Sequence, residues 1–188
     1  MRWGVFILAL AVCLTLDIAF LQVLAIGPIF PGVCGALVVY VSLFAPRLTA
    51  LWAALLTGVM LDLGSPALLS TDQVIHVIGP HALGFVFGAY LVLLLRSIVV
   101  RRNPLTVGML ILPCLLAASL VYMGLWSIRT FYVETQVPWV GDTAVGELGR
   151  LMGWAFYSAI IGIPIGWLLL LSWGIWKFDP AALRAARR

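Results

Sequence analysis

Charged residues are scarce in this sequence, and their scarcity argues against a water-soluble fold. Only 10% of the 188 residues are Asp, Glu, Lys or Arg, whereas 64% are hydrophobic. A soluble globular domain carries about 25% charged residues. The composition therefore predicts a chain that lies in a lipid bilayer. The net charge of +4 comes from basic residues beside apolar runs, and no basic groove or aromatic platform predicts nucleic-acid binding.

Cysteine and histidine are also few, which removes the common signs of a metal or redox site. Cys13, Cys34 and Cys114 lie singly inside apolar runs, so they are interpreted as small packing residues. His76 and His81 are a poor match to the i, i+4 spacing of a helical metal pair. No serine, histidine and acid fall at a spacing that indicates a nucleophile with its base, and no glycine-rich phosphate loop is present. The sequence thus predicts no metal, no cofactor and no enzymatic activity.

Long apolar runs fill the chain instead. A membrane-spanning helix needs about 20 residues, so the length allows roughly six spans. We predict an all-α membrane protein in which residues 1–188 form a single six-helix transmembrane domain. The expected spans are at about residues 3–25, 29–45, 48–63, 80–99, 105–126 and 150–174.

The distribution of basic residues predicts the orientation. With the N-terminus inside, only Arg129 and Arg150 of the 11 basic residues fall in outer segments, which leaves nine on the cytoplasmic side. Cytoplasmic segments are enriched in Lys and Arg, so both termini are expected to be cytoplasmic. Arg96, Arg101 and Arg102 follow the fourth span, where they are most simply interfacial anchors and topology signals.

Asp17 interrupts the first predicted span. It lies about nine residues from the outer end, or roughly 13 Å along a helix. An ionised carboxylate at that depth costs a few kcal/mol, so it must face the bundle or be protonated. Two interpretations remain open. Asp17 either contacts a partner helix or ligand, or it is satisfied inside the bundle by Gln22, His81 or a hydroxyl group.

Asp62 ends the third predicted span, where the helix dipole disfavours a negative charge. A residue that breaks a local rule is a candidate functional site. Asp62 either caps its own turn through the amides of Gly64 or Ser65, or it anchors a partner on the outer face.

Small residues recur at four-residue spacing in three of the spans. Such stripes let two helices approach closely, either within a chain or between chains. For the two glycine pairs, packing within the chain is the simpler interpretation. The residues are Ala11, Thr15 and Ala19 in the first span, Gly84 and Gly88 in the fourth, and Gly162 and Gly166 in the sixth.

A characteristic pattern surrounds the loop between the third and fourth spans. A glycine and an aspartate end one span, a short Ser-Pro turn follows, and a glycine with His-Ala-Leu opens the next span. The residues are Gly58-Val59-Met60-Leu61-Asp62, Ser65-Pro66, Gly79, His81-Ala82-Leu83, Tyr90 and Arg96. This pattern resembles MreD, the family of bacterial rod-shape-determining membrane proteins. The chain length, the six expected spans and the short basic tail also fit that family.

The resemblance implies a multi-pass protein of the bacterial cytoplasmic membrane without enzymatic activity. It would be a scaffold subunit of the cell-elongation complex that supports lateral peptidoglycan synthesis. The implied partner is an MreC-like single-span protein, with wall synthases and the actin-like cytoskeleton as indirect partners and membrane lipids around the bundle. The resemblance also implies a fold similar to the substrate-binding subunits of energy-coupling-factor transporters. Candidate partner-binding residues are Asp17, Asp62, Ser65, His81, Tyr90 and Arg96.

Two other functions stay open from the sequence. The first is a vitamin-binding membrane subunit of an energy-coupling-factor transporter, which requires an outer pocket with several convergent polar groups. The second is an intramembrane enzyme that uses Asp17 and Asp62. It is the weaker of the two because these acids lie on different spans at unequal depths.

Overall fold

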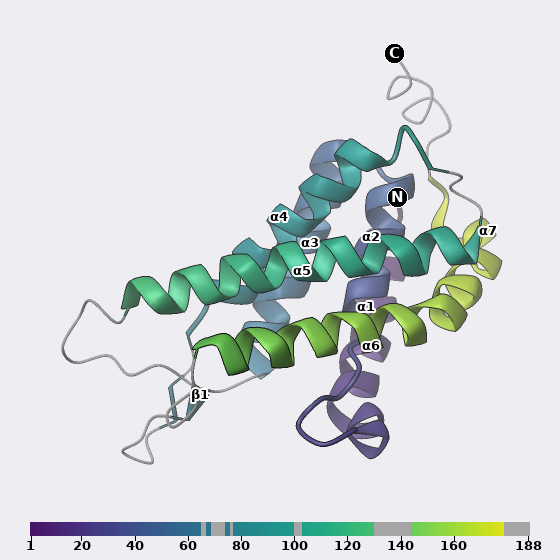
Figure 1. Ribbon diagram of the computed structural model, residues 1–188. Coiled ribbons are helices and arrows are strands. Elements are labelled where there is room, and N and C mark those ends of the chain that lie inside the picture. Colours follow the sequence, from purple (N-terminus) through teal and green to yellow (C-terminus); the bar gives the residue numbers. More distant parts are fainter. Residues whose placement is uncertain (65–66, 69–73, 76, 100–102, 130–143, 179–188) are drawn as a thin grey trace.

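The computed structural model is a bundle of helices (Figure 1) and describes all residues except 65–66, 69–73, 76, 100–102, 130–143 and 179–188. The first helix is continuous but changes its winding. It consists of α1 (Trp3–Thr15), the π-helical turn η1 (Leu16–Phe20) and the 3₁₀ turn η2 (Leu21–Leu24). The remaining helices are α2 (Cys34–Phe44), α3 (Arg47–Gly64), α4 (Pro80–Leu95), α5 (Pro104–Arg129), α6 (Ala144–Leu171) and the short α7 (Trp173–Trp176). Two-residue strands, β1 (Ala67–Leu68) and β2 (Val74–Ile75), pair between α3 and α4.

The helical class and the membrane character predicted from composition are confirmed. Four helical segments of the described chain are long and apolar enough to cross a bilayer: Trp3–Leu24, Arg47–Gly64, Pro104–Ile128 and Val145–Leu171. The segments expected as the second and fourth spans form shorter apolar helices, Cys34–Phe44 and Pro80–Leu95. The fourth helix begins at Pro80, as predicted, because proline at the first helical turn gives up no hydrogen bond. α6 begins about one and a half turns earlier than expected, since Ala144 to Gly149 continue the helix.

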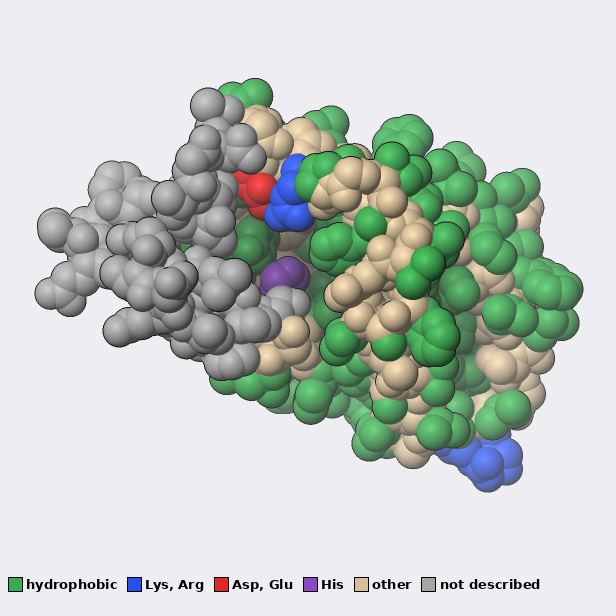
Figure 2. All heavy atoms as spheres, turned by 90° about the horizontal axis from the view of Figure 1, so that it is seen from below, with side chains coloured by type: hydrophobic (Ala, Val, Ile, Leu, Met, Phe, Trp, Pro, Cys, Tyr) green, Lys and Arg blue, Asp and Glu red, His purple; other side chains and the backbone are tan. Residues whose placement is uncertain are grey.

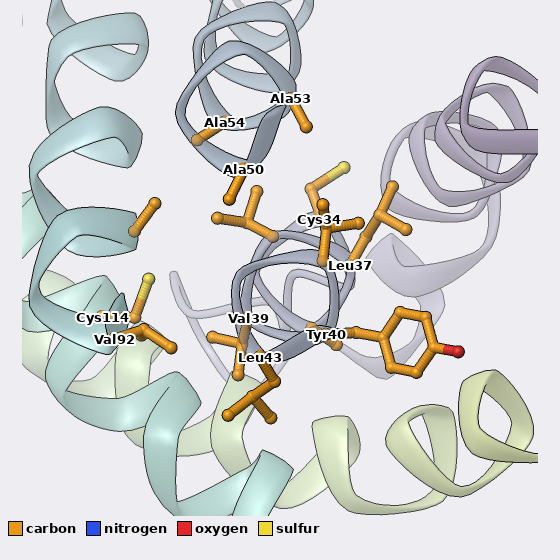
Figure 3. Packing of buried hydrophobic residues seen from close by; sticks show 14 of the residues in the cluster. Cys34, Leu37, Val39, Tyr40, Leu43, Ala50, Ala53, Ala54, Val92 and Cys114 are labelled. Atoms are coloured by element: carbon orange, nitrogen blue, oxygen red, sulfur yellow. The ribbon is translucent and has the colours of Figure 1, made fainter. Parts of the chain in front are cut away.

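The centre of the bundle is α2, whose residues from Cys34 to Phe44 are all buried. Its side chains point outward in several directions and meet the surrounding helices, as Figure 3 shows for Leu37, Val39, Tyr40 and Leu43. With 11 residues it is only about 16 Å long. A helix that is apolar all round and this short belongs to the interior of a bundle.

Glycines set the close approach of α4, α5 and α6. A Cβ atom on Gly84 would lie 2.8 Å from the Ala118 carbonyl oxygen, and one on Gly88 would lie 2.5 Å from the Cys114 carbonyl oxygen. From α6, a Cβ on Gly162 would lie 2.2 Å from the Ile111 side chain of α5. The prediction that these glycine pairs serve packing within the chain is confirmed.

The first helix packs less closely than the others. Its buried side chains are Phe6, Leu10, Cys13 and Leu21, whereas most of its apolar side chains are exposed. The stripe Ala11, Thr15 and Ala19 is exposed within the described structure. This stripe is therefore not used for helix packing inside the described chain.

Both ends of the described chain lie at the same end of the bundle. The backbone amide of Arg2 donates to the carbonyl of Trp176 at 3.2 Å. An aromatic cluster at this end consists of Tyr40, Phe44, Trp173, Trp176 and Phe178. The ring centroids of Phe44 and Trp173 lie 4.5 Å apart. An arrangement with both ends on one side agrees with the sequence-based topology, while the side of the membrane on which they lie stays a prediction.

Candidate functional site

Asp17 is a helix cap inside the bundle. Its carboxylate oxygens accept hydrogen bonds from the backbone amides of Val33 at 2.6 Å and Cys34 at 3.2 Å. These amides open α2, so the negative charge meets the positive end of that helix dipole. The π-helical turn Leu16–Phe20 contains Asp17, and such turns locally change the direction of side chains. Asp17 is thus satisfied inside the bundle, by backbone amides and not by the predicted side chains, while its contact with a ligand or partner helix stays a prediction.

Arg96 occupies the opposite end of α2. Its side chain is buried, and Nη1 donates to the carbonyl oxygens of Ala45 at 2.9 Å and Ser42 at 3.3 Å. The interpretation of Arg96 as an interfacial anchor is therefore wrong. The guanidinium instead satisfies the free carbonyls at the C-terminus of α2, where a positive charge is favoured.

Asp62 links α3 to the start of α4. Only 2% exposed, it accepts hydrogen bonds from the amides of Gly79 at 2.8 Å, His81 at 3.0 Å and Ala82 at 3.1 Å. The His81 Nδ1 atom also lies 2.7 Å from Asp62 Oδ1. Asp62 therefore caps the next helix, while a contact with its own turn at Ser65 lies outside the described residues. The dipole of α3 disfavours the carboxylate, but the positive end of α4 offsets that penalty.

Two glycines make this junction possible. A Cβ atom on Gly58 would lie 2.4 Å from the Ala82 Cα atom, so only glycine allows α3 and α4 to approach so closely. Gly79 is the N-cap residue of α4 with φ of 143°, a conformation that side chains strongly disfavour. Gly79 cannot cap the helix with a side chain of its own, and Asp62 supplies the missing cap.

The other predicted site residues separate into different environments. His81 is 30% exposed, and its ring lies 4.8 Å from that of Tyr122. Tyr90 is 51% exposed on the outward face of α4. Ser65 lies outside the described residues. Partner binding by any of these residues stays a prediction.

A cavity of about 300 Å³ opens at the end of the bundle where Asp17, His81 and the start of α6 meet. That volume is at the lower end of the range for small-molecule sites. Its polar lining is Asp17, Gln22, His81, Tyr122 and Arg150, and its apolar lining includes Phe30, Leu61, Phe85, Leu151 and Trp154. In Figure 2 acidic, basic and histidine side chains gather on this face beside the grey region.

The charges around the cavity are mostly paired. Arg150 binds Glu147 through Nε to Oε2 at 2.8 Å and through Nη2 to Oε1. His81 is held by Asp62. Asp17 has no ion-pair partner within the described part of the chain. Asp17 and His81 were expected as site residues from the sequence, whereas Tyr122, Arg150 and Trp154 were not. The i, i+3 spacing of Glu147 and Arg150 was the available signal for one of them.

Metal ligands do not gather anywhere in the described residues, and the three cysteines are buried and free. No family model, curated protein or solved structure matches the chain. The description of this protein therefore rests on its sequence and geometry: it is a helical protein of membrane character with a capped central helix and a polar cavity at one end.

Proposed function

We propose that this protein is a non-enzymatic membrane scaffold of the MreD type. It would cross the cytoplasmic membrane six times with both termini inside, and support lateral wall synthesis by binding an MreC-like single-span partner. One observation carries the proposal. Five of the residues that carry the resemblance to MreD meet at one junction, where Gly58 contacts Ala82 and Asp62 binds the amides of Gly79, His81 and Ala82. This shared junction supports the proposal.

The six proposed crossings include two helices that are shorter than the other four, Cys34–Phe44 and Pro80–Leu95. α4 has 16 residues, or about 24 Å, and the turn at Arg96 to Ile98 extends it. α2 lies in the core with Pro31 to Val33 before it, all buried. Non-helical backbone is tolerated at membrane depth when protein covers it.

The partner surface that we propose is the outward face of α4. Leu83, Phe87, Tyr90 and Leu94 follow one another along this face, and each is between 51% and 58% exposed. Tyr90 lies ten residues into the helix, about 15 Å from its start, which is within the hydrocarbon region. A phenolic hydroxyl facing lipid would lack a hydrogen-bond partner, whereas a partner helix can provide one.

Co-purification tests this surface directly. The double variant Phe87→Ala with Tyr90→Ala is co-expressed with the MreC-like protein of the same cell and recovered in mild detergent. We expect partner recovery to fall about fivefold or more, which corresponds to a loss of at least ~1 kcal/mol of association free energy. Rod-shaped cells should become round. The matched control, Phe156→Ala with Ile160→Ala, removes two side chains from the exposed face of α6. It should leave partner recovery and cell shape unchanged.

The transporter alternative predicts other results. If the purified wild-type chain alone captures a vitamin tightly, and neither double variant changes partner recovery, the scaffold proposal is overturned. Unchanged recovery and unchanged shape in the Tyr90 variant would also overturn the proposed surface.

A further inference from the structure

The cavity at the end of the bundle has more polar lining than helix packing needs. Polar side chains from the first helix, α4, α5 and α6 line it: Asp17, Gln22, His81, Tyr122 and Arg150. Asp17 uses each carboxylate oxygen for one backbone amide. A carboxylate offers about four acceptor sites, so its capping role leaves acceptor capacity beside the cavity.

A second feature is a buried hydroxyl group beside the cavity. The Ser119 hydroxyl is 4% exposed and has no hydrogen-bond partner in the described structure. It lines a small space of about 20 Å³. This space shares five lining residues with the larger cavity: His81, Phe85, Tyr122, Leu151 and Trp154. Because buried hydroxyls are normally hydrogen-bonded, Ser119 marks a polar contact that the described chain does not complete.

The charge balance indicates the sign of that occupant. Asp17, His81 and Arg150 line the cavity, and His81 and Arg150 pair with Asp62 and Glu147, which do not line it. Among these described residues the three acids outnumber the two basic groups by at least one charge, and the carboxylate without a cationic partner among them is Asp17. A positive group would restore the balance.

The aromatic walls of the cavity indicate the shape of the occupant. Four aromatic residues, Phe30, Phe85, Tyr122 and Trp154, line the same cavity. Aromatic faces attract organic cations and stack against flat rings. We propose that the cavity binds a small ring-bearing organic ammonium, whose positive group lies between Asp17 and Gln22 and whose ring packs among the aromatic side chains. This inference is independent of the scaffold function, because the cavity and the outward face of α4 have no residue in common.

Equilibrium dialysis with the purified full chain tests the site. The probe is radiolabelled phenethylamine, with 3-phenylpropionate and phenethyl alcohol as anionic and neutral competitors of similar shape. Expected is saturable binding that neither competitor displaces at tenfold excess. Asp17→Asn should weaken phenethylamine binding at least tenfold, because the negative charge is lost. Gln22→Ala should weaken it at least fivefold, because the side-chain amide is lost.

Phe85→Leu and Phe156→Leu are the matched pair for the ring. Phe85 lines the cavity, whereas Phe156 is 62% exposed on α6. The first substitution should weaken phenethylamine binding at least fivefold and the second should leave it unchanged. Thermal melting of each variant shows whether it is folded. Because Gln22 is exposed, Gln22→Ala tests the site even if a core variant unfolds.

The membrane itself is one source of ammonium groups. Nanodiscs of phosphatidylglycerol alone are compared with nanodiscs that also contain phosphatidylethanolamine. Inhibition by the ethanolamine lipid would show that an ammonium group without a ring fills the site and would overturn the ring-bearing occupant, whereas equal binding in the two kinds of nanodisc supports a free ring-bearing amine. Absence of saturable phenethylamine binding in phosphatidylglycerol nanodiscs, or equal affinity for 3-phenylpropionate, would overturn the proposal.

Discussion

Asp62 and Gly79 are 17 residues apart, and the carboxylate of the first completes the helix that the second begins, through a hydrogen bond of 2.8 Å. The same carboxylate binds the amides of His81 and Ala82 and the His81 ring. One side chain thereby fixes the end of α3 against the start of α4. The two ends of the intervening loop are therefore held at a fixed distance from each other.

Replacing Asp62 should therefore damage the fold. Asp62→Ala leaves three amides at the start of α4 without their acceptor, in a site that is buried. The loss of a cap and of buried hydrogen bonds should lower the free energy of unfolding by about 1–3 kcal/mol. Thermal melting of the detergent-purified protein checks this. Ser97→Ala, at an exposed position, is the control, and equal melting of the two variants would contradict the assigned cap.

Gly58 should not tolerate even one added methyl group. The Cβ atom of Gly58→Ala would lie 2.4 Å from the Ala82 Cα atom and 2.6 Å from the His81 carbonyl oxygen, both of which are backbone. The helices must separate, which typically costs about 1–3 kcal/mol. Gly124→Ala is the matched control, since no atom lies within 4 Å of its new Cβ, and alanine favours a helix interior by about 1 kcal/mol. Melting temperatures should move in opposite directions, and a Gly58→Ala protein as stable as wild type would refute the close contact.

The proposed topology makes a separate prediction. In a background with Cys13, Cys34 and Cys114 replaced by alanine, single cysteines are placed at Ile78, Val145 and Asn103, all exposed positions. An impermeant thiol reagent should label the first two from outside in intact cells and should label Asn103→Cys only after the membrane is broken. Labelling of Asn103→Cys alone would invert the orientation and move the cavity to the cytoplasmic side.

Sequence reasoning succeeded where a local rule decided the outcome. Apolar runs predicted the helical class, the fourth span was expected to begin near residue 80, where α4 begins, and the glycine pairs were expected to pack within the chain, as they do. It failed where a partner lies far along the chain. The contacts of Asp17 with Val33, and of Arg96 with Ala45, join residues 16 and 51 positions apart. A charge beside an apolar run looks the same in sequence whether it anchors a helix at an interface or caps a buried one.

The cavity was beyond sequence reasoning for a related reason. Its lining comes from six helices and the loop before α2, and each contributes only a few residues. Tyr122 and Trp154 sit in ordinary apolar helices, where aromatic residues usually serve packing or the membrane interface. Only the arrangement of the helices brings them beside Asp17 and Arg150.

The two caps of α2 have a consequence for how the chain is made. Residues 34–44 form a helix that ends within protein at both sides, and its C-terminal carbonyls are bonded by a guanidinium that is synthesised 51 positions later. A nascent chain that has not yet reached Arg96 must leave those carbonyls bonded to other donors, because hydrocarbon supplies none. The final hydrogen bonding of α2 therefore depends on α4, the helix that Arg96 follows.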